Sequence, residues 1–149
     1  MNRLSYKDIA PAAFNALLAL ETQVRKSGLE PVLKELVYLR VSQLNGCAYC
    51  IDMHVRALLA AGQSFERLML VGVWREAPGF DARERAALEW AEAVTTLGPH
   101  GVPDDVYERV RGELGEVTQV QVTLAAVAIN AWNRMNVAFR TPIPDQPAT

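Results

Sequence analysis

Residues 35–54 read ELVYLRVSQLNGCAYCIDMH and contain both cysteines of the chain, Cys47 and Cys50. His54 follows the second cysteine by four residues, and Glu35 precedes the first by twelve. Residues three and four apart share one face of an α-helix, so Cys47, Cys50 and His54 are predicted to project toward one region. This spacing suits thiol catalysis, redox sensing or metal binding.

The residues around the cysteines predict two consecutive helices. Pro31 suits a first helical turn, and the apolar residues after it surround most of a helix that would end near Leu44. Glu35 is conspicuous in such a buried segment. Asn45-Gly46 is a turn signal that can end this helix and cap the next one, which would run from the cysteines to Gly62.

Apolar periodicity and capping signals predict five further helices. Asp81, with Glu84 three residues later, resembles a capping box at the start of one of them. The five segments are approximately residues 10–27, 64–77, 81–97, 103–114 and 117–140. Residues 141–149 are expected to be irregular or loosely docked. The predicted fold class is therefore all-α, with six or seven helices in one domain over residues 1–149.

Composition and charge exclude several broad classes of function. Half of the 149 residues are hydrophobic, which is enough for a substantial core. The 15 Lys and Arg against 17 Asp and Glu give a net charge of −2, so neither nucleic acid nor an anionic membrane is an expected partner. No stretch has the roughly 20 apolar residues of a membrane helix. The start of the chain has no uninterrupted signal-type core, so we expect a cytoplasmic protein.

The two cysteines are predicted to be chemically unequal. Cys47, at the first turn of a helix, would face unsatisfied backbone N–H groups that favour its thiolate. His54, one turn after Cys50, could instead take the proton of that thiol. The two arguments point at different sulfur atoms, and they are compatible if one cysteine attacks and the other closes a disulfide.

The pattern E-x(11)-C-x-x-C-x-x-x-H in residues 35–54 resembles the core motif of the AhpD-like alkylhydroperoxidases, within the carboxymuconolactone decarboxylase superfamily. The resemblance implies an all-α, homo-oligomeric peroxidase that needs no cofactor. Glu35 and His54 would form a proton relay, Cys50 would be the activated thiol, and Cys47 would form a disulfide with it. The implied partners are a hydroperoxide substrate and a thiol or protein reductant.

The sequence departs from the peroxidase branch at Tyr49, where founding members carry a histidine immediately before the second cysteine. A phenol is a poor base at neutral pH, so the resemblance does not decide how efficient a peroxidase this would be or which electron donor it would use. A disulfide reductase or adaptor for a dihydrolipoyl or thioredoxin-type partner is therefore the main alternative. A decarboxylase or lactone-directed activity is the least favoured reading, since it would leave the C-x-x-C unexplained.

Two interpretations of the cysteines in which the protein catalyses no reaction also remain. Cys47, Cys50 and His54 could bind zinc with Glu35 or His100 as a fourth ligand, in an interaction or redox-sensing module, although structural zinc sites normally combine ligands from separate segments. The cysteines could also be two small buried hydrophobic residues.

The stretch INAWNRMN, residues 129–136, is unusual for the middle of a helix. Asn130, Asn133 and Asn136 are weak helix formers, and Arg134 lies among them. These side chains could be solvated, or they could form a polar network that lines a pocket or a subunit contact.

Overall fold

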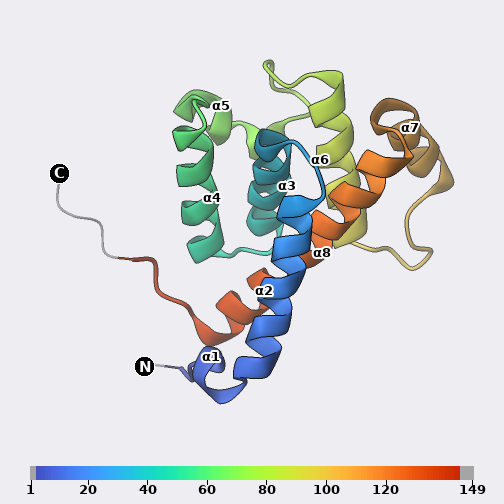
Figure 1. Ribbon diagram of the computed structural model, residues 1–149. Helices are drawn as coiled ribbons and strands as arrows, with labels where there is room; N and C mark the ends of the chain where they lie inside the picture. The colour runs from blue at the N-terminus through green and yellow to red at the C-terminus, as the bar shows by residue number, and fades with distance from the viewer. Residues whose placement is uncertain (1–2, 145–149) are drawn as a thin grey trace.

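The structure, a computed structural model, describes residues 3–144 and is built from α-helices (Figure 1). The elements in chain order are α1 (Tyr6–Ile9), α2 (Pro11–Lys26), α3 (Pro31–Leu44), α4 (Ala48–Ala60), α5 (Phe65–Met69), a 3₁₀ turn η1 (Val71–Val73), α6 (Ala82–Thr95), α7 (Asp104–Leu114) and α8 (Glu116–Phe139). The described residues contain no strand, only an isolated bridge between Gly98 and Gly101. The predicted all-α class is confirmed.

Helix α3 lies at the centre of the molecule and packs against α4, α6 and α8 (Figure 1). Its apolar side chains point into two separate clusters. Leu36 and Leu39 join the cluster shared with α4, α5 and α6, whereas Val37 and Val41 join the larger cluster shared with α2, α6, α7 and α8. A helix buried on both sides must be apolar around most of its circumference, as its sequence predicted.

The predicted boundaries of several helices agree with the structure. The segment 31–44 is α3, and the capping box of Asp81 and Glu84 is present at the start of α6. The prediction for residues 141–149 can be checked only to residue 144. Up to there the chain is irregular, and residues 145–149 lie outside the described range.

The helix predicted over residues 64–77 is wrong in its length. Ser64 does cap a helix, but α5 ends at Met69 and is followed by η1 and a turn. The guanidinium of Arg85, from α6, supplies hydrogen bonds to carbonyl groups of the irregular segment that follows η1. It donates to the carbonyl oxygens of Trp74 (2.9 Å), Arg75 (3.3 Å), Ala77 (2.6 Å) and Phe80 (2.9 Å).

Helix α1 was not predicted. It has only four residues, too few for a periodic pattern, and Tyr6 is its one buried side chain. Within residues 3–144, no helix is both long and apolar enough to cross a membrane.

We expect Arg85→Ala to lower the free energy of unfolding by about 3 kcal/mol, because four backbone carbonyls lose a charged donor. Urea denaturation measures the change. Arg56→Ala is the control, since Arg56 forms an ion pair with Asp52 at a half-exposed surface position and its loss should cost less than about 1 kcal/mol. Equal losses in the two variants would contradict this role of Arg85.

Candidate functional site

The two cysteines lie at the start of α4. Gly46, with φ of 65°, lets the chain turn after α3, and Cys47 then occupies the N-cap position. The expectation that Asn45-Gly46 would cap α4 is therefore wrong by one residue. The sulfur of Cys47 performs this role by accepting a hydrogen bond of 3.3 Å from the backbone N–H of Cys50.

Cys47 and Cys50 form a disulfide, with their sulfur atoms 2.07 Å apart. Both residues are buried, with exposed fractions of 1% and 0%. The pairing that the resemblance implied is thus present in the structure. In this form neither thiol is free to bind a metal, and the described residues contain no group of three His, Cys, Asp or Glu side chains placed to hold one.

Glu35 and His54, which are 19 positions apart, meet across the α3–α4 interface. Nδ1 of His54 lies 2.7 Å from Oε2 of Glu35, and Nζ of Lys34 lies 2.9 Å from Oε1. Burial raises the pKa of the Glu35 carboxyl, but hydrogen bonds from His54 and Lys34 outweigh it and leave the pKa below its ordinary value. Glu35 is therefore ionised at neutral pH.

The ionised Glu35 determines which nitrogen of His54 carries a proton. A carboxylate can only accept hydrogen bonds, so Nδ1 must be the donor, and in the neutral ring Nε2 is left with its lone pair. The ring also packs edge-on against Tyr38, with centroids 4.9 Å apart, and Tyr38 in turn donates a hydrogen bond of 2.8 Å to Glu21. Burial, followed by the nearby Glu21, raises the pKa of Tyr38, so its hydroxyl stays neutral.

Nε2 of His54 is buried and has no hydrogen-bond partner among residues 3–144, and no other buried side-chain nitrogen or oxygen there shares this condition. Native structures leave few such atoms unpaired, and each one needs an explanation. His54 is also one of the residues that line a cavity, so its ring lies at the cavity wall.

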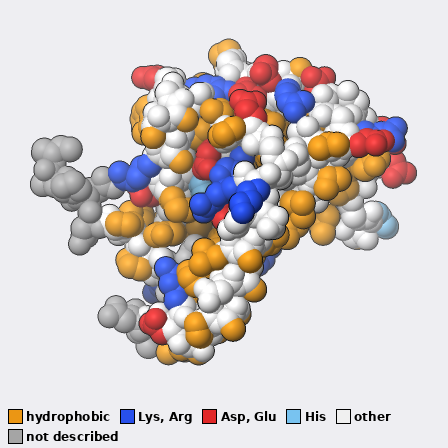
Figure 2. Space-filling view, viewed as in Figure 1, with side chains coloured by type: hydrophobic (Ala, Val, Ile, Leu, Met, Phe, Trp, Pro, Cys, Tyr) orange, Lys and Arg blue, Asp and Glu red, His pale blue; other side chains and the backbone are white. Residues whose placement is uncertain are grey.

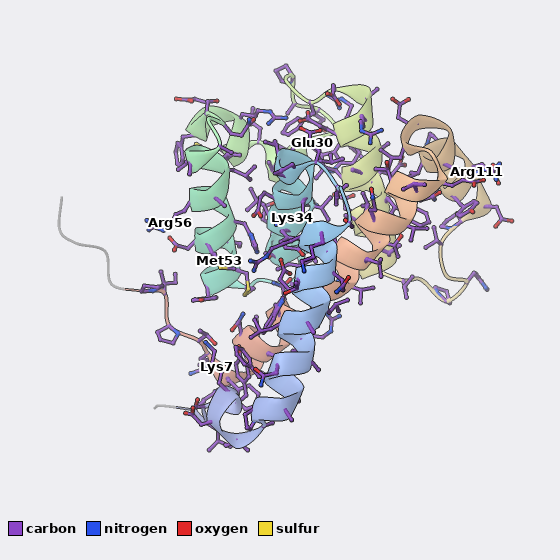
Figure 3. All side chains as sticks on the ribbon, viewed as in Figure 1. Lys7, Glu30, Lys34, Met53, Arg56 and Arg111 are labelled. Carbon is purple, nitrogen blue, oxygen red and sulfur yellow. A yellow bond between two sulfur atoms is a disulfide. The ribbon has the colours of Figure 1, made fainter. Side chains whose placement is uncertain are left out.

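The cavity has a volume of about 520 Å³ and lies between α2, α3, α4 and α8. Its apolar lining includes Phe14, Leu18, Met53, Ile129 and Trp132, and its charged lining includes Lys7, Arg25 and Lys34. Figure 3 labels three of these residues, Lys7 on α1, Lys34 on α3 and Met53 on α4. Figure 2 shows Lys and Arg side chains gathered beside hydrophobic ones on this face. Volume and lining match a site for a small, mainly apolar molecule.

The disulfide lies behind the cavity wall. Tyr49 and His54 line the cavity, whereas neither cysteine does. The structure thus places the residue that departs from the peroxidase pattern, Tyr49, directly on the cavity. It leaves His100 in an exposed loop between α6 and α7, outside the lining.

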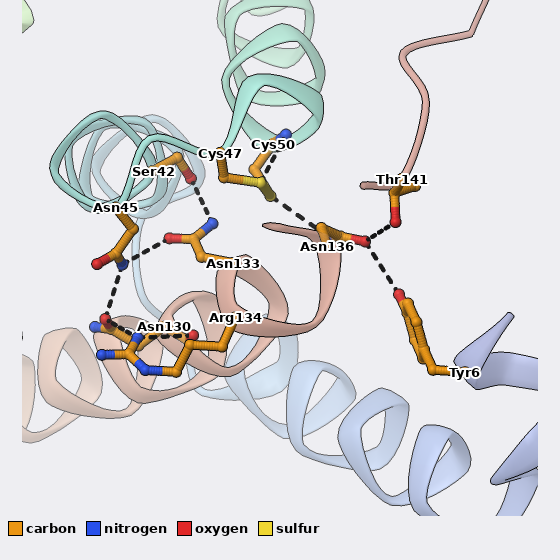
Figure 4. The surroundings of a disulfide bond; sticks show 10 residues. All are labelled: Tyr6, Ser42, Asn45, Cys47, Cys50, Asn130, Asn133, Arg134, Asn136 and Thr141. Atoms are coloured by element: carbon orange, nitrogen blue, oxygen red, sulfur yellow. Dashed lines mark hydrogen bonds between the residues drawn. A yellow bond between two sulfur atoms is a disulfide. The ribbon is translucent and has the colours of Figure 1, made fainter. Parts of the chain in front are cut away.

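The asparagines of α8 form polar contacts with the cysteine segment, so the network alternative is confirmed (Figure 4). The amide of Asn45 donates to Oδ1 of Asn130 (2.9 Å) and of Asn133 (3.0 Å), and Asn133 donates to the hydroxyl of Ser42 (3.0 Å). Arg134 lies at the exposed edge, where it donates to Asn130 (2.7 Å).

Asn136 contacts the disulfide itself. Its Nδ2 lies 3.5 Å from Sγ of Cys50, while its Oδ1 accepts hydrogen bonds from Tyr6 (3.1 Å) and Thr141 (2.8 Å) (Figure 4). The sequence marked Asn136 only as an unusual helix residue. Tyr6 is 130 positions away in the chain, and no sequence signal connects it to the cysteines.

Comparisons with known proteins agree with this architecture. The model of the carboxymuconolactone decarboxylase family matches residues 11–93. The uncharacterized protein YdfG of Bacillus subtilis is 37% identical over 92% of this chain and 93% of its own length. The uncharacterized protein YnjA of Escherichia coli is 30% identical over 79% of this chain, which spans 64% of YnjA.

Two solved structures share the fold. A protein of unknown function from Agrobacterium tumefaciens, described as a candidate antioxidant defence protein AhpD, superposes with a TM-score of 0.93 at 42% identity. The match covers 98% of this chain and 100% of that one. An uncharacterized peroxidase-related protein with an AhpD core from Ralstonia eutropha JMP134 gives a TM-score of 0.81 over 93% and 74% of the two chains. At 22% identity, this second likeness concerns the fold alone.

The lowered pKa of Glu35 predicts how stability depends on pH. An unfolded glutamate protonates near 4.5, whereas folded Glu35 protonates at lower pH, so its charge stabilises the fold above that value. This contribution is lost as the pH falls through the folded pKa. Urea titrations between about pH 6 and pH 3 should show the stability advantage of the wild type over Glu35→Gln shrinking. Glu30→Gln, at the exposed start of α3, is the control, and an advantage independent of pH would refute the assignment.

Proposed function

Because this chain belongs to the carboxymuconolactone decarboxylase family and combines a C-x-x-C disulfide with a partly buried Glu–His pair, we propose that it is a thiol-dependent peroxidase for organic hydroperoxides. The observation that carries the proposal is the unpaired, buried Nε2 of His54 at a mainly apolar cavity. An alkyl hydroperoxide offers an apolar group for the walls and an O–H for that nitrogen. The antioxidant description of the Agrobacterium relative supports the same class of reaction.

The oxidation of the reduced protein would proceed in two steps. His54, one helical turn after Cys50, takes the proton of the Cys50 thiol at Nε2, while Glu35 stabilises the resulting imidazolium. The thiolate attacks an oxygen of the hydroperoxide, the O–O bond breaks, and the alkoxide receives the proton from His54 as an alcohol. Cys50 is now a sulfenic acid, which the Cys47 thiol converts to the disulfide with release of water.

An external dithiol returns the protein to its reduced state by thiol–disulfide exchange. The reductant is thereby oxidised to its own disulfide, and Cys47 and Cys50 regain their two protons and two electrons. No other cofactor is required by this scheme.

A disulfide reductase or electron-transfer adaptor is the second candidate, and Tyr49 is the observation that favours it. A phenol lines the cavity where the peroxidase branch has a histidine, and a phenol adds no base at neutral pH. Such a protein would exchange thiols rapidly with a dithiol partner and would turn over hydroperoxide slowly.

Stopped-flow oxidation of the fully reduced protein by an organic hydroperoxide separates the two candidates. The wild type should react far faster than free cysteine and form one intramolecular disulfide. Cys50→Ser should lower the rate constant of the fast oxidation phase by at least about 10³-fold, whereas Cys47→Ser should keep the fast phase and accumulate sulfenic acid. Wild-type oxidation no faster than free cysteine would reject the peroxidase and favour thiol exchange.

The proton relay predicts a second set of rate losses. His54→Gln should lower the second-order rate constant for oxidation about 10²-fold or more at neutral pH, because no base remains beside Cys50. Glu35→Gln should also lower it, because the neutral amide can donate to Nδ1 and favour the wrong tautomer. The exposed Glu30→Gln should react like the wild type. Unchanged oxidation rates in both relay variants would remove Glu35 and His54 from the mechanism.

A further inference from the structure

Asn136 is the polar side chain of α8 that touches Sγ of Cys50. The residue is buried, with 6% of its surface exposed, and its Nδ2 lies 3.5 Å from that sulfur. A sulfur acceptor forms longer hydrogen bonds than oxygen, so this separation is within reach of an N–H donor. The contact joins residues 86 positions apart and therefore depends on the packing of α8 against α4.

The sulfur determines which way the amide points, since the hydroxyls of Tyr6 and Thr141, 3.1 and 2.8 Å from Oδ1, can donate or accept (Figure 4). A disulfide sulfur or a thiolate has no proton to donate, so the opposite orientation would place the carbonyl oxygen against it with no hydrogen bond. The amide is therefore held with its N–H groups toward Cys50. Burial and the nearby Tyr49 raise the pKa of Tyr6, which keeps its hydroxyl protonated as a donor.

A buried thiolate at Cys50 needs a donor of this kind. Cys50 is fully buried, and burial without compensation disfavours the charged form of a thiol. The backbone N–H of Cys50 is directed to the other sulfur, that of Cys47. His54 carries an N–H at Nε2 only while it holds the proton taken from Cys50, whereas an amide N–H is a donor in every protonation state of the site.

We propose that Asn136 is a further catalytic residue, whose amide stabilises the thiolate of Cys50 in the reduced protein. The inference rests on the proposed role of Cys50 as the attacking thiol. Asn136 exchanges no proton, so it complements His54, which provides the base. Tyr6 and Thr141 are positioning residues, because they act through the orientation of the amide.

The same contact favours attack on one of the two sulfurs when an external thiol reduces the disulfide. An incoming thiolate that attacks Sγ of Cys47 forms a mixed disulfide there, and the original S–S bond breaks. Cys50 then leaves as a thiolate that receives the hydrogen bond from Asn136. A leaving thiol of lower pKa departs faster, so the donor on Cys50 directs attack to Cys47.

The test measures the pKa of Cys50 directly, without any peroxide. In a Cys47→Ser background Cys50 is the one remaining cysteine, and the pH dependence of its alkylation by iodoacetamide gives its apparent pKa. Adding Asn136→Leu should raise this pKa by about one unit and slow alkylation below it about tenfold, because one hydrogen bond to the charged sulfur is lost. Tyr6→Phe removes a single hydroxyl, keeps the ring, and should shift the pKa in the same direction by less.

Asn133→Ala is the matched control. It lies one turn earlier on α8 and is also buried, but it contacts Ser42 and Asn45 instead of sulfur. Circular dichroism establishes that each variant is folded. An unchanged pKa in both Asn136→Leu and Tyr6→Phe, or an equal shift in Asn133→Ala, would overturn the proposal.

The result of the pKa measurement is independent of the result of the peroxidase assay. If the wild type oxidises slowly with hydroperoxide while Asn136→Leu still raises the pKa, Asn136 stabilises the thiolate of a protein that is not a peroxidase. If the wild type is a fast peroxidase and the pKa does not move, the peroxidase proposal stands and the role of Asn136 is refuted.

Discussion

The hydrogen bond between Glu35 and His54 constrains the arrangement of α3 and α4, and the site depends on that arrangement. Glu35 lies nine residues before the end of α3, and His54 lies six residues after the start of α4. At about 1.5 Å per residue these are axial distances of roughly 14 and 9 Å, measured from the two helix ends that meet at the α3–α4 turn. A spacing shifted by one or two residues would rotate either side chain off the shared interface.

The site is a small polar region inside an otherwise apolar core, and such a region is stable only if its groups are paired. Glu35 has His54 and Lys34, Tyr38 has Glu21, and the asparagines of α8 bond to residues of the α3–α4 turn or to Cys50. The exception in the described part of the chain is Nε2 of His54, at the cavity. Among the described residues, the polar network thus pairs the other buried side-chain nitrogens and oxygens and leaves this nitrogen without a partner.

The parts of this arrangement that follow from local sequence could be predicted. Apolar periodicity gave α3, the capping box gave the start of α6, and the E-x(11)-C-x-x-C-x-x-x-H pattern identified the residues of the α3–α4 site. Contacts made over long chain separations could not. Residues 64–77 look helical, but Arg85 from α6 binds carbonyl groups of the irregular stretch that replaces the end of that helix, and Tyr6 from α1 contacts Asn136 and lines the cavity. The periodicity of a segment contains no information about a donor that comes from another helix.

The two sulfur atoms differ in the kind of donor that each can use. Cys47 accepts a backbone N–H, which every residue except proline would supply at position 50, so its stabilisation follows from its place at the helix start. Cys50 depends on side chains, with Asn136 as a donor at its sulfur and His54, the base in the proposed mechanism, one turn away on α4. Substitutions can therefore adjust Cys50 while leaving Cys47 nearly constant. Tyr49 fits this division, because it lines the cavity, whereas the hydrogen bonds to the two sulfurs come from the backbone of Cys50 and from Asn136.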